Sequence, residues 1–143
     1  IFPIPRIINT IHCQYYAYTR MRLIKEFQIE AAHLLPNLPI GHKCRRLHGH
    51  SFRIIVSIEG EVDPELGWVM DYADISDAFK PVFDMLDHNY LNDVAGLDNP
   101  TSENIARWVW QKLITTLPQL YSIEVRETCN SMCIYFGDSE NSV

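Results

Sequence analysis

Three histidines have the spacing needed to bind one metal ion. His48 and His50 are two residues apart at the start of an expected strand, so both imidazoles face the same side of it. His33 ends an earlier expected strand, on the face that carries its apolar residues. If the two strands pair as antiparallel neighbours, the rings converge, and three neutral imidazoles with an open fourth position form a catalytic zinc site. The alternative is that each histidine is an ordinary core or surface residue.

A cysteine lies in a basic loop just before the histidine pair. Cys44 is flanked by Lys43, Arg45 and Arg46. Nearby positive charge favours the thiolate, which suits a proton-transferring base or a nucleophile. The same cations would attract an anionic substrate such as a phosphate ester. The alternative is an ordinary solvated basic loop.

Two acidic positions complete the set of candidates. Glu127 interrupts an apolar strand face, between Val125 and Cys129, and a carboxylate in a core is costly unless it is paired or binds something. Its oxygens could accept two N–H donors from a heterocycle; alternatively, an edge position or a bulge turns it to solvent. Asp87 beside His88 can tune the imidazole for proton relay, although adjacent residues on a helix do not face each other.

Composition and charge restrict the classes of protein to consider. The chain has 143 residues, 47% of them hydrophobic, and a formal net charge of −6. This acidity argues against direct nucleic-acid binding, and no stretch approaches the ~18 uncharged apolar residues of a membrane span. The cysteines are too few for a disulfide scaffold and no secretory segment precedes them, so we expect a soluble domain in the reducing cytoplasm. Cys129 and Cys133 are expected to be structural thiols.

Hydrophobic periodicity predicts the elements that position these residues. Alternation predicts strands over 23–33, 51–59, 123–129 and 132–136, and helical spacing predicts helices over 74–86 and 101–117, with Pro81 as a bend in the first. The order is β-β-α-α-β-β, an α+β fold with an antiparallel sheet. The first twenty residues contain no Asp or Glu, and Met21 resembles a translation start. We therefore expect residues 1–20 to be an extension and 21–143 to be a single domain.

Five short motifs occur together and in order along the chain. They are Phe27-x-x-x-Ala31-Ala32-His33, Cys44-x-x-x-His48-Gly49-His50, Asp87-His88-x-x-Leu91-Asn92, Pro100-Thr101-Ser102-Glu103-Asn104 and Glu127-Thr128. Over about residues 21–137 the set resembles the 6-pyruvoyltetrahydropterin synthase superfamily. The short spacing from Cys44 to His48 is similar to that of the bacterial carboxytetrahydropterin synthases of queuosine biosynthesis.

This resemblance implies a role for each candidate residue. His33, His48 and His50 would bind Zn²⁺. Cys44 would be the proton-abstracting base, assisted by Asp87 and His88, while Glu127 anchors the pterin ring and Thr101, Ser102, Glu103 and Thr128 line the pocket. The implied reaction converts 7,8-dihydroneopterin triphosphate to 6-carboxy-5,6,7,8-tetrahydropterin with release of acetaldehyde and triphosphate.

The resemblance also implies the tunnelling fold (T-fold), in which subunits join their sheets edge to edge into a barrel. The expected assembly is a homo-oligomer, a hexamer made of two trimers, in which Cys44 and the Asp87–His88 pair of one site come from different chains. The expected partner is the small-molecule pterin triphosphate, with neither nucleic acid nor membrane involved. Two alternatives stay open: an enzyme whose product keeps the 6-pyruvoyl side chain, and a non-catalytic zinc-binding or pterin-binding module.

Overall fold

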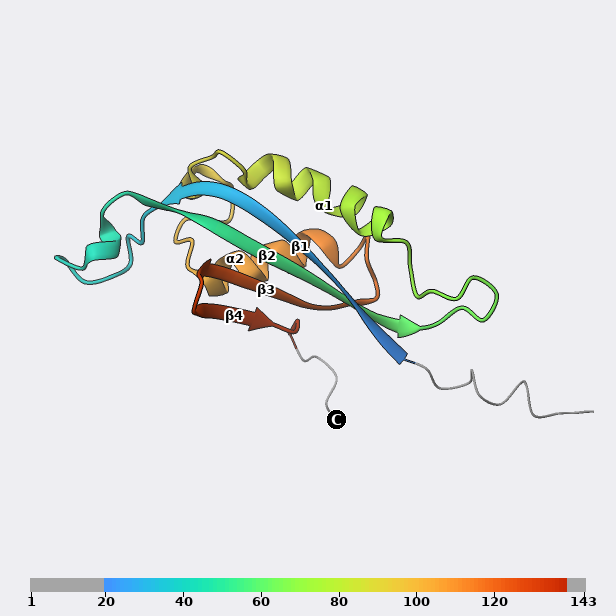
Figure 1. The fold of residues 1–143 in the computed structure, drawn as a ribbon. Helices are drawn as coiled ribbons and strands as arrows, with labels where there is room; N and C mark the ends of the chain where they lie inside the picture. Colours follow the sequence, from blue (N-terminus) through green and yellow to red (C-terminus); the bar gives the residue numbers. More distant parts are fainter. Residues whose placement is uncertain (1–19, 139–143) are drawn as a thin grey trace, which may run out of the picture.

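A four-stranded antiparallel sheet carries both helices on one face (Figure 1). The computed structural model describes residues 20–138, and the sheet order is β1-β2-β3-β4. The elements are β1 (Arg20–His33), β2 (His48–Glu61), α1 (Tyr72–Leu86), α2 (Ser102–Leu113), β3 (Leu120–Thr128) and β4 (Ser131–Tyr135), with short 3-10 helices η1 (Lys43–Arg45) and η2 (Leu91–Asp93). This architecture confirms the α+β prediction. The expected extension lies outside the described residues except for Arg20, which begins β1.

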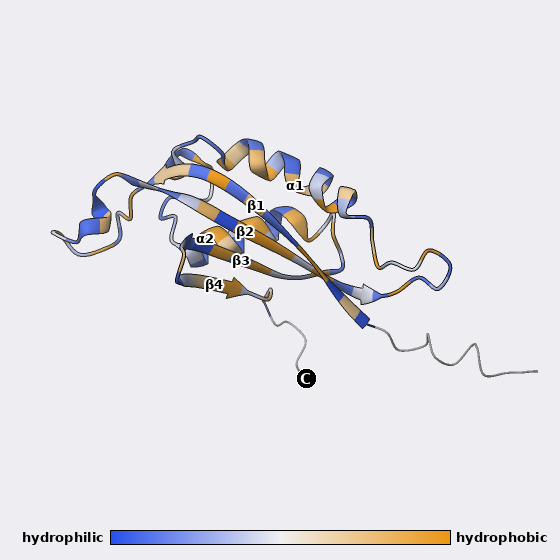
Figure 2. Ribbon diagram, viewed as in Figure 1, coloured by the Kyte–Doolittle hydropathy of each residue, from blue (hydrophilic) through white to orange (hydrophobic). Residues whose placement is uncertain are grey.

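The core lies between the sheet and the helices. The inward-facing residues of β2 are completely buried; they are Phe52, Ile54, Val56 and Ile58. Helix α1 buries Ile75, Phe79, Val82 and Leu86 against them, and the ring of Phe79 stacks on Phe27 of β1 with centroids 3.9 Å apart. Hydrophilic and hydrophobic residues alternate along β1, as the period-two pattern predicts (Figure 2).

Some element boundaries differ from the prediction. Strand β2 begins at His48 instead of residue 51, because the ladder with β1 continues to the His33–His48 pair. Helix α2 ends at Leu113 and not at 117, and the hairpin between β3 and β4 turns at residues 129–130. Ladder pairing and helix termination depend on tertiary contacts that local periodicity does not contain.

Two further features of the elements could not be read from alternation. Helix α1 continues through Pro81. Ile55 and Ser57 are buried although they lie on the outward face of β2, where they are flanked by residues of both neighbouring strands. Neither α1 nor α2 has the length and hydropathy needed to cross a lipid bilayer.

Candidate active site

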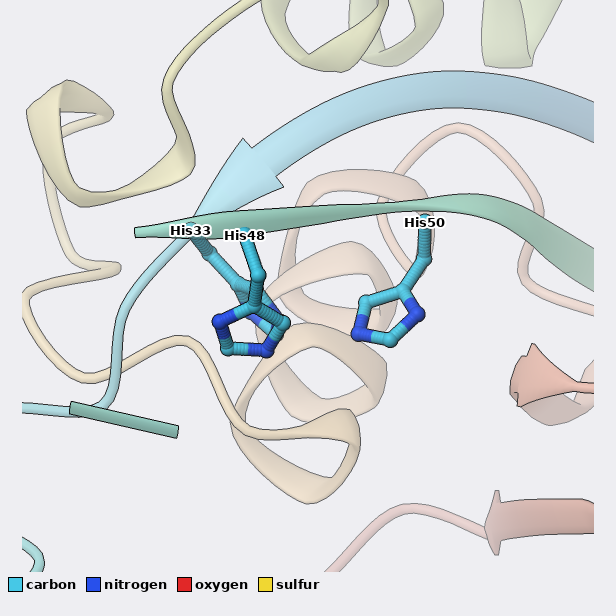
Figure 3. Close-up of side chains that lie close together, drawn as sticks. All are labelled: His33, His48 and His50. Carbon is cyan, nitrogen blue, oxygen red and sulfur yellow. The ribbon is translucent and has the colours of Figure 1, made fainter. Parts of the chain in front are cut away.

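The register of β1 and β2 brings the three histidines together. His33 lies directly opposite His48, and His50 lies opposite Ala31. All three side chains project to the same side of the two strands (Figure 3). One ring nitrogen from each lies within 4.8 Å of the other two, as a shared metal ion requires. The predicted convergence of the three rings is confirmed.

Backbone carbonyl groups select which nitrogen of two rings is free. His33 Nδ1 lies 2.9 Å from the carbonyl oxygen of Pro100, and His48 Nδ1 lies 2.7 Å from that of Arg46. A carbonyl only accepts hydrogen bonds, so each Nδ1 carries the proton and each Nε2 keeps its lone pair. The Nε2 atoms of His33 and His50 are buried without a hydrogen-bond partner. Such orphaned nitrogens fit a metal site, and neutral imidazole nitrogens are preferred ligands of Zn²⁺.

Burial supports the neutral form of His33, the innermost of the three histidines. The His33 side chain is fully buried. Desolvation lowers the pKa of its imidazole, opposed by the hydrogen bond to Pro100 and by the charge of Glu127. A lowered pKa keeps the ring unprotonated near neutral pH, which metal binding requires.

The histidines open onto a cavity of about 590 Å³ that holds other predicted site residues. Cys44, Glu127 and Thr128 line it, together with the cations Lys43 and Arg46. The three histidines, a thiol, a carboxylate and two cations therefore share one space, and its volume suits a small-molecule ligand.

The loop before β2 holds Cys44 at the cavity wall. Cys44 N donates to His42 Nδ1 over 3.1 Å, and the Cys44 carbonyl accepts from Leu35 N over 2.8 Å. Arg45 contacts the loop backbone: its Nη1 donates to the carbonyl oxygens of Pro36 and Leu38, both at 2.6 Å. Of the three cations around Cys44, Arg45 thus stabilises the loop, while Lys43 and Arg46 line the cavity.

Glu127 lies at an irregularity in the β3–β4 ladder. The pairing register shifts between Arg126 and Thr128, which leaves Glu127 outside the regular pairing. The alternative to an inward-facing carboxylate was a bulge that turns it to solvent, but at this irregularity Glu127 is half-buried and lines the histidine cavity. Bulges often re-aim a side chain in this way beside functional sites.

Asp87 and His88 contact each other but do not line the histidine cavity. Asp87 Oδ2 lies 2.7 Å from His88 Nδ1, and Asp87 Oδ1 accepts from Glu30 N over 2.9 Å. Asp87 ends α1 in an extended conformation and His88 has a φ of 55°, so the two are not on a helix and can face each other. His88 instead lines a recess of about 530 Å³ with Glu30 and other residues, and His50 is the one described residue common to both spaces.

The Asp87–His88 pair is electrostatically coupled. The hydrogen bond from Glu30 N, followed by the one with His88, lowers the pKa of Asp87. The hydrogen bond with Asp87 and its charge raise the pKa of His88. These opposite shifts favour a carboxylate beside an imidazolium, which is a suitable proton-transfer pair.

The three predicted pocket residues at the start of α2 form the cap and the first turn of that helix. Thr101 caps the helix, its Oγ1 accepting from Asn104 N over 3.3 Å, and Ser102 and Glu103 form the first turn. None of the three is among the residues that line the histidine cavity. The sequence interpretation missed the carbonyl groups of Pro100 and Arg46, and residue types carry no signal for them because every residue has a carbonyl.

Comparison with known proteins gives consistent matches. The family model for 6-pyruvoyl tetrahydropterin synthase matches residues 22–138. The chain is 48% identical over 121 residues to a 6-carboxy-5,6,7,8-tetrahydropterin synthase of Synechocystis sp., covering 80% of this chain and 92% of that protein. It is 34% identical over 114 residues to the 6-pyruvoyl tetrahydrobiopterin synthase of Homo sapiens, covering 71% and 76%. The structure of Caenorhabditis elegans 6-pyruvoyl tetrahydropterin synthase superposes with a TM-score of 0.77 at 28% identity, covering 84% of this chain and 97% of that one.

Proposed function

The chain belongs to the 6-pyruvoyl tetrahydropterin synthase family of pterin enzymes, and from this premise we propose that it is a 6-carboxytetrahydropterin synthase. It converts 7,8-dihydroneopterin triphosphate to 6-carboxy-5,6,7,8-tetrahydropterin, triphosphate and acetaldehyde, in the cytoplasm and as a step towards queuosine. The observation that carries this proposal is the opening of the histidine trio onto the same cavity as Cys44 and Glu127.

Zn²⁺ is the metal proposed for the histidine trio. His33, His48 and His50 hold it through ring nitrogens, with Pro100 and Arg46 fixing the orientation of two of the rings. When bound, the ion supplies Lewis acidity to the side-chain oxygens of the substrate. A set of three histidines, without a fourth protein ligand, is typical of catalytic zinc sites and not of structural ones.

The other residues of the cavity bind the substrate and transfer its protons. Glu127 accepts two N–H groups of the pterin ring, which fixes the orientation of the substrate. Cys44 removes a proton from the substrate side chain, and Lys43 and Arg46 attract the triphosphate. Thr128, beside Glu127 on the cavity wall, contacts the ring.

Proton movement along the side chain is what these residues must catalyse. Shifting protons between the side-chain carbons and oxygens reduces the dihydropterin ring while the side chain is oxidised, and triphosphate leaves. Cleavage between the first and second side-chain carbons adds the elements of water across that bond. The first carbon then becomes the carboxylate and the other two leave as acetaldehyde.

A second copy of the chain completes the proposed site. Within one chain, Asp87 and His88 are separated from the cavity that contains Cys44. The proposed relay between them is formed when a neighbouring subunit places its His88 recess against the cavity. The sheet has two edge strands, β1 and β4, and joining such edges into a T-fold barrel buries their unpaired backbone groups. We propose a hexamer made of two trimers.

Product analysis tests the proposal. The zinc-loaded protein is incubated with 7,8-dihydroneopterin triphosphate and the products are identified by mass spectrometry. Acetaldehyde and 6-carboxytetrahydropterin are the expected products. A 6-pyruvoyl product without acetaldehyde would assign the chain to the pyruvoyl-forming branch. An intact zinc-loaded oligomer with no turnover would favour a binding module over an enzyme.

A further inference from the structure

Glu30 is attached to the Asp87–His88 pair through its backbone. Its N–H donates to Asp87 Oδ1 over 2.9 Å, and its carbonyl oxygen accepts from His88 N over 2.6 Å. These two bonds hold the end of α1 against β1. Any residue type would supply them, so they do not explain why position 30 carries a carboxylate.

The Glu30 carboxylate accepts hydrogen bonds from two neighbouring side chains. Its Oε1 accepts from Gln28 Nε2 over 2.9 Å and its Oε2 accepts from Ser51 Oγ over 2.7 Å. Glu30, Ser51 and His88 line a common recess. Exposed polar contacts of this kind add little to stability, so the more informative property of the group is its negative charge on the wall of the recess that also contains His88.

We propose that Glu30 is a positioning residue for the Asp87–His88 pair, with a carboxylate, fixed by Gln28 and Ser51, that sets the pH range in which His88 transfers a proton. The proposal rests on the relay role proposed above for that pair. It adds a third member to the relay, one that need not touch the substrate.

The charges around His88 support this assignment. The titratable groups that face it are Asp87 at the end of α1, which contacts its ring, and Glu30 on β1, His50 on β2 and Tyr90 in the following segment, which line the same recess. Asp87 raises the pKa of His88 most, and the charge of Glu30 acts in the same direction. The hydrogen bonds from Gln28 and Ser51 lower the pKa of Glu30, so it stays ionised where His88 titrates.

A ring titration measures the effect without relying on activity. The imidazole resonances of the zinc-loaded full chain are followed by NMR across the pH range, and His88→Ala identifies the His88 signal. Glu30→Gln should move the His88 midpoint to lower pH. Glu26→Gln is the matched control, because Glu26 lies four residues earlier on the same strand and pairs with Arg53. In Glu26→Gln the midpoint of the His88 titration should equal that of the wild type.

Kinetics then separates a positioning role from a structural one. At neutral pH we expect Glu30→Gln to lose part of its kcat with little change in KM. Most of the loss should be recovered at lower pH, where His88 is protonated again. Glu30→Asp, which keeps a carboxylate, should recover most of the wild-type profile.

Each outcome has a defined meaning. An unchanged His88 midpoint in Glu30→Gln, or an equal shift in Glu26→Gln, would overturn the positioning role. A kcat loss that is equal at all pH values would make Glu30 merely structural. If the wild-type protein gives no pterin product, the proposed function fails, while the NMR midpoints still decide whether Glu30 acts on His88.

Discussion

A few individual atoms decide what the histidine cluster can bind. The carbonyl groups of Pro100 and Arg46 each occupy one ring nitrogen, which leaves the other available for a metal ion. Gly49, between two of the histidines, is required by the close approach of the strands: a Cβ there would lie 2.9 Å from the Ala31 carbonyl oxygen. The side chains of this centre could be predicted from the sequence, because His-x-His spacing on a strand fixes a common face. The two carbonyl groups could not, since they depend on the fold.

Cys44 is the residue whose loss should separate chemistry from metal binding. We expect Cys44→Ala to reduce kcat by at least about a hundredfold, because the proposed proton-abstracting group is removed. Zinc content should stay at the wild-type value, since the three histidines are intact. Steady-state kinetics and metal analysis measure the two quantities. Cys129→Ala, at the exposed hairpin turn, is the control and should retain full activity, whereas near-normal turnover in Cys44→Ala would refute its role as the base.

Secondary-structure ends position several of the functional groups. Thr101 caps α2 directly after Pro100, so the helix start and the orientation of His33 are neighbours in the chain. Asp87 and His88 likewise lie where α1 ends. The helices themselves were predictable from their apolar spacing. The link between a helix end and a ligand ring was not, because it joins residues far apart in sequence.

A cap substitution distinguishes the two roles available to Thr101. Thr101→Ala should lower the free energy of unfolding by about 1 kcal/mol, because the hydroxyl that accepts from Asn104 N is lost. Thr101→Ser keeps that acceptor and should be close to wild type. Chemical denaturation gives the stabilities, and KM for the pterin substrate is measured alongside. A higher KM in Thr101→Ala at unchanged stability would instead support the predicted contact with substrate.

The backbone conformation of His88 predicts an unusual order of stabilities. A φ of 55° is strained for residues with a Cβ and accessible to glycine. His88→Gly should therefore be more stable than His88→Ala by about 1 kcal/mol, although both lack the imidazole and should be inactive. Urea titrations at one protein concentration compare them. Equal stabilities would mean that this segment relaxes to a different conformation when the ring is removed.

Within a single chain, the proposed catalytic residues do not all line the same cavity. The histidine trio, Cys44, Glu127 and Thr128 share a cavity, as the sequence predicts, whereas His88, to which Asp87 is hydrogen-bonded, lines another recess. The order of elements and the antiparallel sheet were predictable because alternation and helical spacing are strong in β1, β2, α1 and α2. Where Asp87 and His88 lie relative to the histidine cavity depends on the path of the chain after α1, for which the sequence has no local signal.

Mixed oligomers test whether sites are shared between chains. Cys44→Ala and His88→Ala should each be inactive alone. If one chain supplies Cys44 and another supplies His88, randomly mixed assemblies contain some sites with both groups intact and should recover about a quarter of wild-type activity. Activity is measured after the two variants are co-expressed or refolded together. No recovery in verified mixed oligomers would mean that both groups of a site come from the same chain.

The segment after α1 also covers part of an edge strand. Ala32 N donates to the Asn89 carbonyl over 3.2 Å, His88 N donates to Glu30 over 2.6 Å, and Ala32 forms a parallel bridge with Tyr90. An open strand edge is a template for uncontrolled aggregation. Here the last residues of β1 are already occupied, so an incoming strand can add only along the earlier part of that edge. The segment that carries His88 therefore restricts the register in which another chain can join the sheet.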